Sequence, residues 1–259
     1  VDDHLMGITH VVRGNEYLSS TPKYNRLYDA FGWDVPKYIH VPLITDENHK
    51  KLAKRSGHSS FEDLLEQGFL TETIINFVAL LGWSPASNQE IFTLDELIKE
   101  FDYLHMSKSP AVFDYTKLKW MNGEYIKKAD SARITALCIP FLQAAGVLAA
   151  ELTAEEQQWV HDLVALHQDK LKSASEIVEH TALFFKDEVV DEDEAKEVLA
   201  EDTVPTVLTS FIAQLESADA DFSVDGIKTM IKNVQKETGC KGKALFMPIR
   251  AAITGQTHG

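Results

Sequence analysis

The spacing of apolar residues changes near residue 60, and this change constrains the fold more than any other feature. Before it, two short β-branched segments, "ITHVVRG" (8–14) and "KYIHVPLIT" (37–45), flank "SSTPKYNRLYDAFGW" (19–33). The middle segment opens with helix-capping hydroxyl residues and reaches a glycine near its end, as helices do. Strand, helix and strand in this order predict a βαβ unit with two parallel strands.

Beyond residue 60, apolar residues recur at i, i+3 and i+4, which is the spacing of amphipathic helices. We expect no strand in this part and two packed helical bundles, with a boundary in the polar stretch between 170 and 190. The chain is therefore predicted to be mainly α. The predicted helices are 59–69, 71–83, 93–101, 114–129, 131–146, 153–171, 173–185, 191–201, 204–217 and 223–239.

Composition excludes several classes of protein. The chain has 259 residues, enough for one large domain or two to three smaller ones, and no run of about 18 apolar residues that would predict a membrane span. Cys138 and Cys240 lie far apart and form no CxxC pair, which indicates two reduced thiols in a cytoplasmic protein. Ten histidines occur without HExxH or HxxEH spacing, so we expect no metal site.

The charges are unevenly distributed. The formal net charge is −15, yet "HKKLAKRSGH" (49–58) places four cations within six positions directly after the second predicted strand. Ligands of open α/β sheets bind at the carboxyl ends of strands, so this loop could clamp phosphates. The alternative is a solvated basic loop. The acidic stretch 186–203 and the lysine-rich stretch 226–259 also allow a basic face on an acidic protein.

The segment "KLAKR" (51–55) resembles the KMSKS-type signature of class I aminoacyl-tRNA synthetases. The stretches "VDDHLMGITHVVRGNEYLSSTPKY", "FLTETIINFVALLGWSP", "SKSPAVFDYTKLKWMNGEYI" and "GKALFMPIRAAITGQTHG" resemble the bacterial-type glutamyl-tRNA synthetase family, and the resemblance covers essentially the whole chain. It implies a partial Rossmann-type α/β catalytic remnant in 1–65, a helical stem-contact domain in 66–175 and a truncated helical anticodon-binding domain in 176–259.

The resemblance also implies that individual residues of this chain help to activate glutamate with ATP and Mg²⁺. Arg13 would bind the side-chain carboxylate of glutamate, unless it forms a structural ion pair with Asp2 or Asp3. Lys51 and Lys54 would stabilise the leaving pyrophosphate. The positions implied to contact ATP are Glu16, Tyr17, Leu43, Ile44, Lys51, Lys54 and Arg55.

Other residues would hold the RNA. The resemblance makes tRNA(Glu) the expected partner, and the basic candidates for binding it are Lys119, Lys241, Lys243 and Arg250. Arg250 could instead be a buried structural arginine. Many members of the family that reject tRNA(Gln) carry an arginine at the position of Ala182. The alanine makes tRNA(Gln) a second candidate partner. Helical spacing predicts that Phe113, Leu118, Trp120, Met121 and Tyr125 belong to the core.

The second class I signature, HIGH, is absent from these 259 residues. We therefore expect a fragment, cut at both ends, that does not aminoacylate alone, and the resemblance implies a monomer. A glutamate–tRNA ligase is the first hypothesis. The alternatives are a non-catalytic tRNA-binding module and a helical interaction protein without an RNA role.

Overall fold

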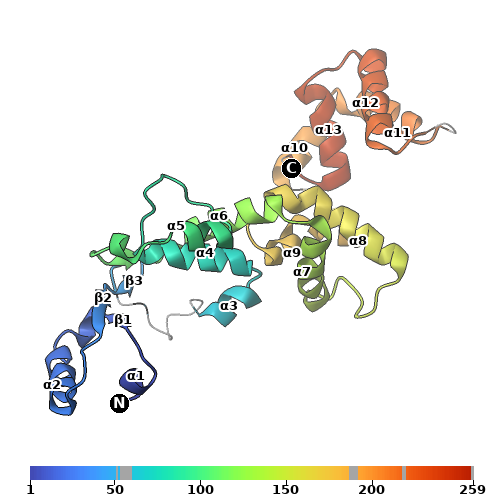
Figure 1. The fold of residues 1–259 in the computed structure, drawn as a ribbon. Helices are drawn as coiled ribbons and strands as arrows, with labels where there is room; N and C mark the ends of the chain where they lie inside the picture. The colour runs from blue at the N-terminus through green and yellow to red at the C-terminus, as the bar shows by residue number, and fades with distance from the viewer. Residues whose placement is uncertain (51, 53–59, 187–191, 218–219, 258–259) are drawn as a thin grey trace. The chain divides into compact units, whose positions relative to one another are not determined.

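The computed structural model describes residues 1–259 except 51, 53–59, 187–191, 218–219 and 258–259 (Figure 1). The chain divides into two compact units, Val1–Thr181 and Ala182–Gly259. This division falls within residues 170–190, the range in which the sequence suggested a boundary. It does not separate 1–65 from 66–175, so the three-domain division stays a prediction.

The chain begins with the predicted βαβ unit. Strand β1 (His10–Gly14) pairs in parallel with β2 (Lys37–Val41), and α2 (Thr21–Phe31) connects them through the short 3-10 helix η1 (Asn15–Tyr17). A proline in the first turn starts α2, and Gly32 ends it at φ 68°, a left-handed conformation that favours glycine. A four-residue helix, α1 (Asp2–Leu5), precedes β1 and was not expected from the sequence.

The expectation that no strand lies beyond residue 60 was wrong. The predicted strand 37–45 breaks after Val41, next to Pro42, because proline has no backbone N–H for a ladder. A two-residue strand, β3 (Ile44–Thr45), follows and pairs in parallel with β4 (Ala111–Val112). A two-residue strand is too short to show a period of two, so β4 left no signal in the sequence.

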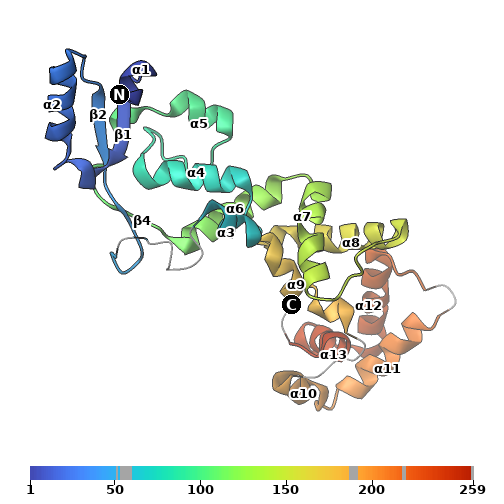
Figure 2. The ribbon, with the colours of Figure 1, turned by 90° about the horizontal axis from the view of Figure 1, so that it is seen from below.

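The helices between β3 and the middle of the first unit pack around two hydrophobic clusters. These helices are α3 (Phe61–Glu66), α4 (Thr71–Gly82), α5 (Leu94–Glu100), the 3-10 helix η3 (Tyr103–His105) and α6 (Tyr115–Lys128) (Figure 2). Capping boxes at Ser60 and Thr93 start α3 and α5. One cluster lies between α3, α4 and α6, where Phe77, Leu118 and Met121 are fully or almost fully buried. The other lies at Trp83, Phe92 and Leu97.

The rest of the first unit comprises α7 (Ser131–Ala144), α8 (Ala154–His167), the 3-10 helices η4 (Gln168–Lys170) and η5 (Ala174–Glu176), and α9 (Ile177–His180). The predicted helix 173–185 is therefore broken into short pieces. Thr181, at the end of α9, donates its hydroxyl to the carbonyl of Ile177 at 2.6 Å. Such a side-chain bond back to the preceding turn competes with regular helix propagation.

The second unit consists of η6 (Ala182–Phe185), α10 (Asp193–Leu199), α11 (Val204–Leu215), α12 (Val224–Thr238) and α13 (Lys243–Thr254). Val207, Phe211 and Leu245 form the centre of its core. Helix α13, which contains Pro248, was not among the predicted helices. Within the described ranges, no helix of either unit is long and apolar enough to cross a membrane.

Candidate functional site

Arg13 lies at the centre of a cluster that α2, β1 and β2 build together. Its NH2 group donates to the Thr21 hydroxyl at 2.8 Å, and its Nε donates to His40 Nε2 at 3.4 Å. The guanidinium carbon lies 5.3, 5.1 and 4.8 Å from the ring centroids of Tyr17, Tyr24 and Tyr38. Tyrosine faces attract a cation at this range, so the three rings hold a half-buried guanidinium in place.

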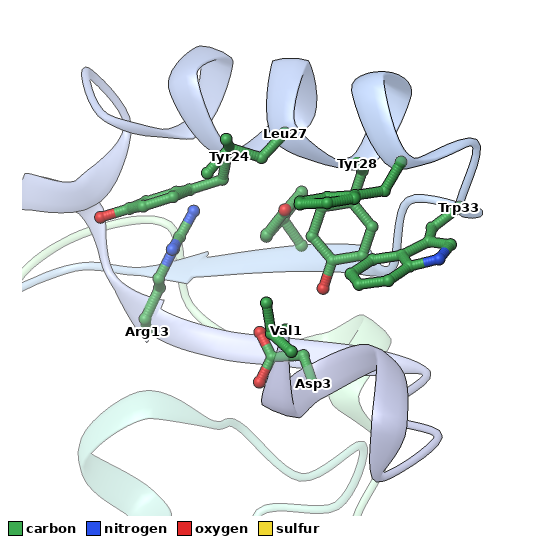
Figure 3. A pocket seen from close by; sticks show the side chains of 9 residues that line it. Val1, Asp3, Arg13, Tyr24, Leu27, Tyr28 and Trp33 are labelled. Carbon is green, nitrogen blue, oxygen red and sulfur yellow. The ribbon is translucent and has the colours of Figure 1, made fainter.

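The side chain of Arg13 borders a pocket of about 250 Å³ (Figure 3). Tyr24 and Tyr28 reach into it from α2, and Trp33 closes one end. Among the described residues, no carboxylate forms an ion pair with Arg13, so the alternative of a pair with Asp2 or Asp3 was wrong. Desolvation and the negative charge of Asp3 raise the pKa of Tyr28. A cation without an anion at a pocket can bind an anionic ligand.

Two of the residues expected to contact ATP, Glu16 and Tyr17, lie in η1, which follows β1. Tyr17 is 46% exposed, so its ring is available on one side for stacking, and Glu16 is exposed. The Glu16 carboxylate folds back over Gly14, where a Cβ atom would come within 2.0 Å of it. A side chain at position 14 would therefore displace this exposed, flexible carboxylate.

A hydrogen-bonded turn connects the end of the second predicted strand to the basic loop. Leu43 is half-buried and Ile44 is 36% exposed, and the Ile44 carbonyl accepts the N–H of Leu52 at 3.2 Å. Asp46 then accepts the N–H groups of Asn48 and Lys50 at 2.9 and 2.8 Å. These bonds form a tight turn at which the loop leaves β3.

The three expected phosphate-binding residues of this loop, Lys51, Lys54 and Arg55, lie outside the described residues. Within the described ranges, no group of three His, Cys, Asp or Glu side chains could hold a metal ion. The free thiol of Cys138 is buried, and burial raises its pKa to about 12. It is therefore protonated and unreactive at neutral pH.

The four residues predicted to bind RNA are spread over both units. Lys119 on α6 pairs with Glu176 at 2.9 Å, which raises the pKa of this lysine. Lys241 and Lys243 are exposed on either side of Gly242 at the start of α13. Arg250 is exposed and donates to the carbonyl of Thr257 at 3.3 Å, so the alternative of a buried structural arginine was wrong.

Sequence reasoning named Tyr17 only as a contact of ATP and missed the other residues that surround Arg13. Thr21 and Tyr24 lie three positions apart on one face of α2, and Tyr17 lies in η1. Tyr38 and His40 share one face of β2, and His40 lies opposite Arg13 in the parallel register. A predicted βαβ unit with a fixed register would have brought all of them to Arg13, but the register was not predictable from the sequence alone.

Comparison with known proteins connects both units to one enzyme class. Residues 1–120 match the family described as "tRNA synthetases class I (E and Q), catalytic domain", and residues 133–259 match "Anticodon binding domain". The chain is 51% identical to the glutamate–tRNA ligase of Bacillus subtilis and 52% identical to that of Geobacillus stearothermophilus. These alignments include 100% of this chain but 54% and 53% of the relatives.

Solved structures agree with the sequence comparison. The crystal structure of a glutamate tRNA ligase from Elizabethkingia meningosepticum in complex with its amino acid superposes with a TM-score of 0.84 at 30% identity. The alignment covers 100% of this chain and 53% of that one. A glutamate-tRNA synthetase from Elizabethkingia anophelis gives a TM-score of 0.85, also at 30% identity. The chain thus spans about half the length of the relatives it matches.

Proposed function

Because this chain belongs to the class I glutamyl-tRNA synthetase family, we propose that its protein joins glutamate to tRNA at the expense of ATP. In the first step, the α-carboxylate of glutamate attacks the α-phosphate of ATP and releases pyrophosphate. In the second, the terminal ribose hydroxyl of the tRNA takes the acyl group and AMP leaves. The observation that carries this proposal is the Arg13 cluster.

Arg13 selects the amino acid in this proposal. Its guanidinium borders the pocket, forms no ion pair with a described carboxylate and is fixed by Thr21 and three tyrosine rings. A fixed guanidinium binds a carboxylate through two parallel hydrogen bonds. Glutamine would leave the cation without a counter-charge, and an unpaired buried charge is strongly destabilising. The cluster therefore supports glutamate as the substrate.

ATP binds next to this cluster in the same proposal. Tyr17 stacks on the adenine, Glu16 contacts the ribose, and Leu43 and Ile44 border the base. Lys51 and Lys54, with Arg55 beside them, stabilise the charge that develops on pyrophosphate. Mg²⁺ comes with the triphosphate, since this ion is bound mainly through phosphates and water with few carboxylates.

The helical parts hold the RNA in this proposal. Lys119, Lys241, Lys243 and Arg250 contact phosphates or bases of tRNA(Glu). Lys119 must then exchange its partner Glu176 for a phosphate. Ala182, in η6, leaves room for tRNA(Gln) as a second substrate. A monomeric state and a cytoplasmic location complete the proposal.

The rival proposal is a tRNA-binding module without catalysis, and it rests on the match of residues 133–259 to an anticodon-binding domain. One experiment separates the two. The full-length protein is incubated with labelled glutamate, tRNA and ATP, and label in precipitable tRNA is counted. Charging that requires ATP and releases pyrophosphate supports the ligase. Binding of tRNA without any charging would overturn the ligase and leave the binding module.

A further inference from the structure

The solvent-facing side of α6 carries a tryptophan between two ion pairs. Trp120 is 41% exposed, so the expectation that it belongs to the core was wrong. Lys117, one turn before it, pairs with Glu90, and Lys127, two turns after it, pairs with Glu124 at 2.7 Å. On α6, Lys117, Glu124 and Lys127 lie three, four and seven positions from Trp120, so these residues share one face of the helix.

Trp120 also borders an open pocket of about 400 Å³. Its other lining residues are Glu90, Asp114, Thr116 and Lys117. The lining thus combines one large aromatic face with a cation and hydroxyl and carboxylate oxygens. An aromatic face beside a cation is the combination with which proteins stack a base and hold the neighbouring phosphate.

The ion pair between Lys117 and Glu90 does not prevent phosphate binding. Both side chains are well exposed, at 37% and 47%, and exposed pairs contribute little to stability. A phosphate can therefore replace Glu90 at the lysine at low cost. The carboxylate then acts as a competitor for the cation, and its removal should strengthen the binding of a polyanion.

The position of α6 in the chain indicates which polyanion binds at this pocket. The catalytic-domain match ends at residue 120, and the anticodon-domain match begins at residue 133. Helix α6, residues 115–128, therefore connects the two parts. A tRNA, the polyanion of the proposed function, is therefore the candidate ligand of this helix.

We propose that the pocket at Trp120 binds an unpaired nucleotide of the tRNA, with the base stacked on the indole and the adjacent phosphate on Lys117. This inference rests on the proposed function, because it assumes that tRNA is the ligand. It adds a contact on α6, where the catalytic-domain match ends in the sequence. It also assigns a role to the exposed tryptophan that the core does not use.

The test measures the affinity of the protein for a tRNA(Glu) transcript at several salt concentrations. Trp120→Ala should weaken binding about fivefold or more, which is the lower end of base-stacking effects. Trp120→Phe should restore most of the affinity, because it keeps an aromatic face. Lys117→Ala should weaken binding and reduce the slope of log K against log salt by about one. Glu90→Gln should instead strengthen binding at low salt.

Trp159→Ala is the matched control, because Trp159 on α8 is 44% exposed and lies outside the pocket. It should leave the affinity unchanged. The inference is overturned if the affinity of Trp120→Ala for tRNA is within twofold of that of the unaltered protein. It is also overturned if Trp159→Ala weakens tRNA binding as much as Trp120→Ala does. In both cases the proposed function stands. If the unaltered protein does not bind tRNA at all, the inference and the proposed function are both overturned. If Trp120→Ala folds poorly, Glu90→Gln still tests the inference. Weaker tRNA binding by Glu90→Gln would also overturn it.

Discussion

At the scale of single residues, Asn122 is a fully buried amide that connects three segments. It accepts the N–H of Leu70 at 2.9 Å and donates to the carbonyl of Lys172 at 2.7 Å. Asn122→Leu removes the amide to which both groups bond. The buried N–H of Leu70 and the carbonyl of Lys172 are then left without this partner. We expect the free energy of unfolding to fall by about 2 kcal/mol or more.

Urea unfolding followed by circular dichroism measures this loss. Asn15→Leu, at an exposed position of η1, is the control and should change stability by less than about 0.5 kcal/mol. Equal stabilities of Asn122→Leu and the control would show that the buried amide does not hold the segments together.

A second prediction at this scale concerns pH. Arg133 donates to both carboxylate oxygens of Glu72, and these hydrogen bonds lower the pKa of Glu72 below its ordinary value of 4.5. A lowered pKa means that the stabilisation is present above pH 4.5 and is lost as the pH falls through the folded-state pKa. Glu72→Gln should therefore be less stable than the unaltered protein at pH 7 and equally stable near pH 2.

Thermal unfolding midpoints of both proteins from pH 7 down to pH 2 measure the difference. Glu62→Gln, at an exposed carboxylate of α3, is the control. A stability gap between Glu72→Gln and the unaltered protein that stays constant over this range would contradict the assignment of the ion pair.

At the scale of elements, the turn between α3 and α4 packs tightly against the segment that precedes α9. Gly68 has φ 83°, and a Cβ atom there would lie 2.9 Å from both Cβ and N of Ala174. The N–H of Ala174 donates to the Gly68 carbonyl at 3.1 Å, and Ser175 donates its hydroxyl to the Gln67 carbonyl at 2.9 Å. The two segments are therefore joined backbone to backbone.

Gly68→Ala should destabilise the first unit more than the left-handed backbone alone explains. Gly146→Ala is the matched control, because Gly146 has φ 74° but no atom within 4 Å of the added Cβ. We expect the free energy of unfolding to fall by about 1 kcal/mol in the control and by clearly more in Gly68→Ala. The comparison of their urea midpoints gives the packing contribution, and equal losses would contradict the close approach.

Some elements were predictable from the sequence and others were not. The βαβ unit was found because the periods, capping residues and Gly32 agree with one another. The strands β3 and β4 have two residues each, so their pairing depends on tertiary contacts that no local pattern reveals. In the same way, the motif identified Arg13, whereas Tyr38 and His40 reach it only through the register of β1 and β2.

At the scale of the whole molecule, the net charge of −15 conceals local basic sites. Lys241, Lys243 and Arg250 are exposed around α13 in a chain that is acidic as a whole. Exposed charges act over roughly 8 Å at physiological salt, so an RNA responds to the local cations rather than to the distant acidic residues. An acidic composition therefore does not argue against tRNA as the partner.

Arg13 is the residue that we propose to bind the side-chain carboxylate of the substrate glutamate. The most direct measurement is kcat/KM of the full-length protein for glutamate and for glutamine in tRNA charging. Arg26→Ala, at an exposed arginine of α2, serves as the control. Arg13→Ala should lower kcat/KM for glutamate about 100-fold or more and change the low value for glutamine little. Glutamate kinetics of Arg13→Ala within a few-fold of the unaltered protein would contradict the claim.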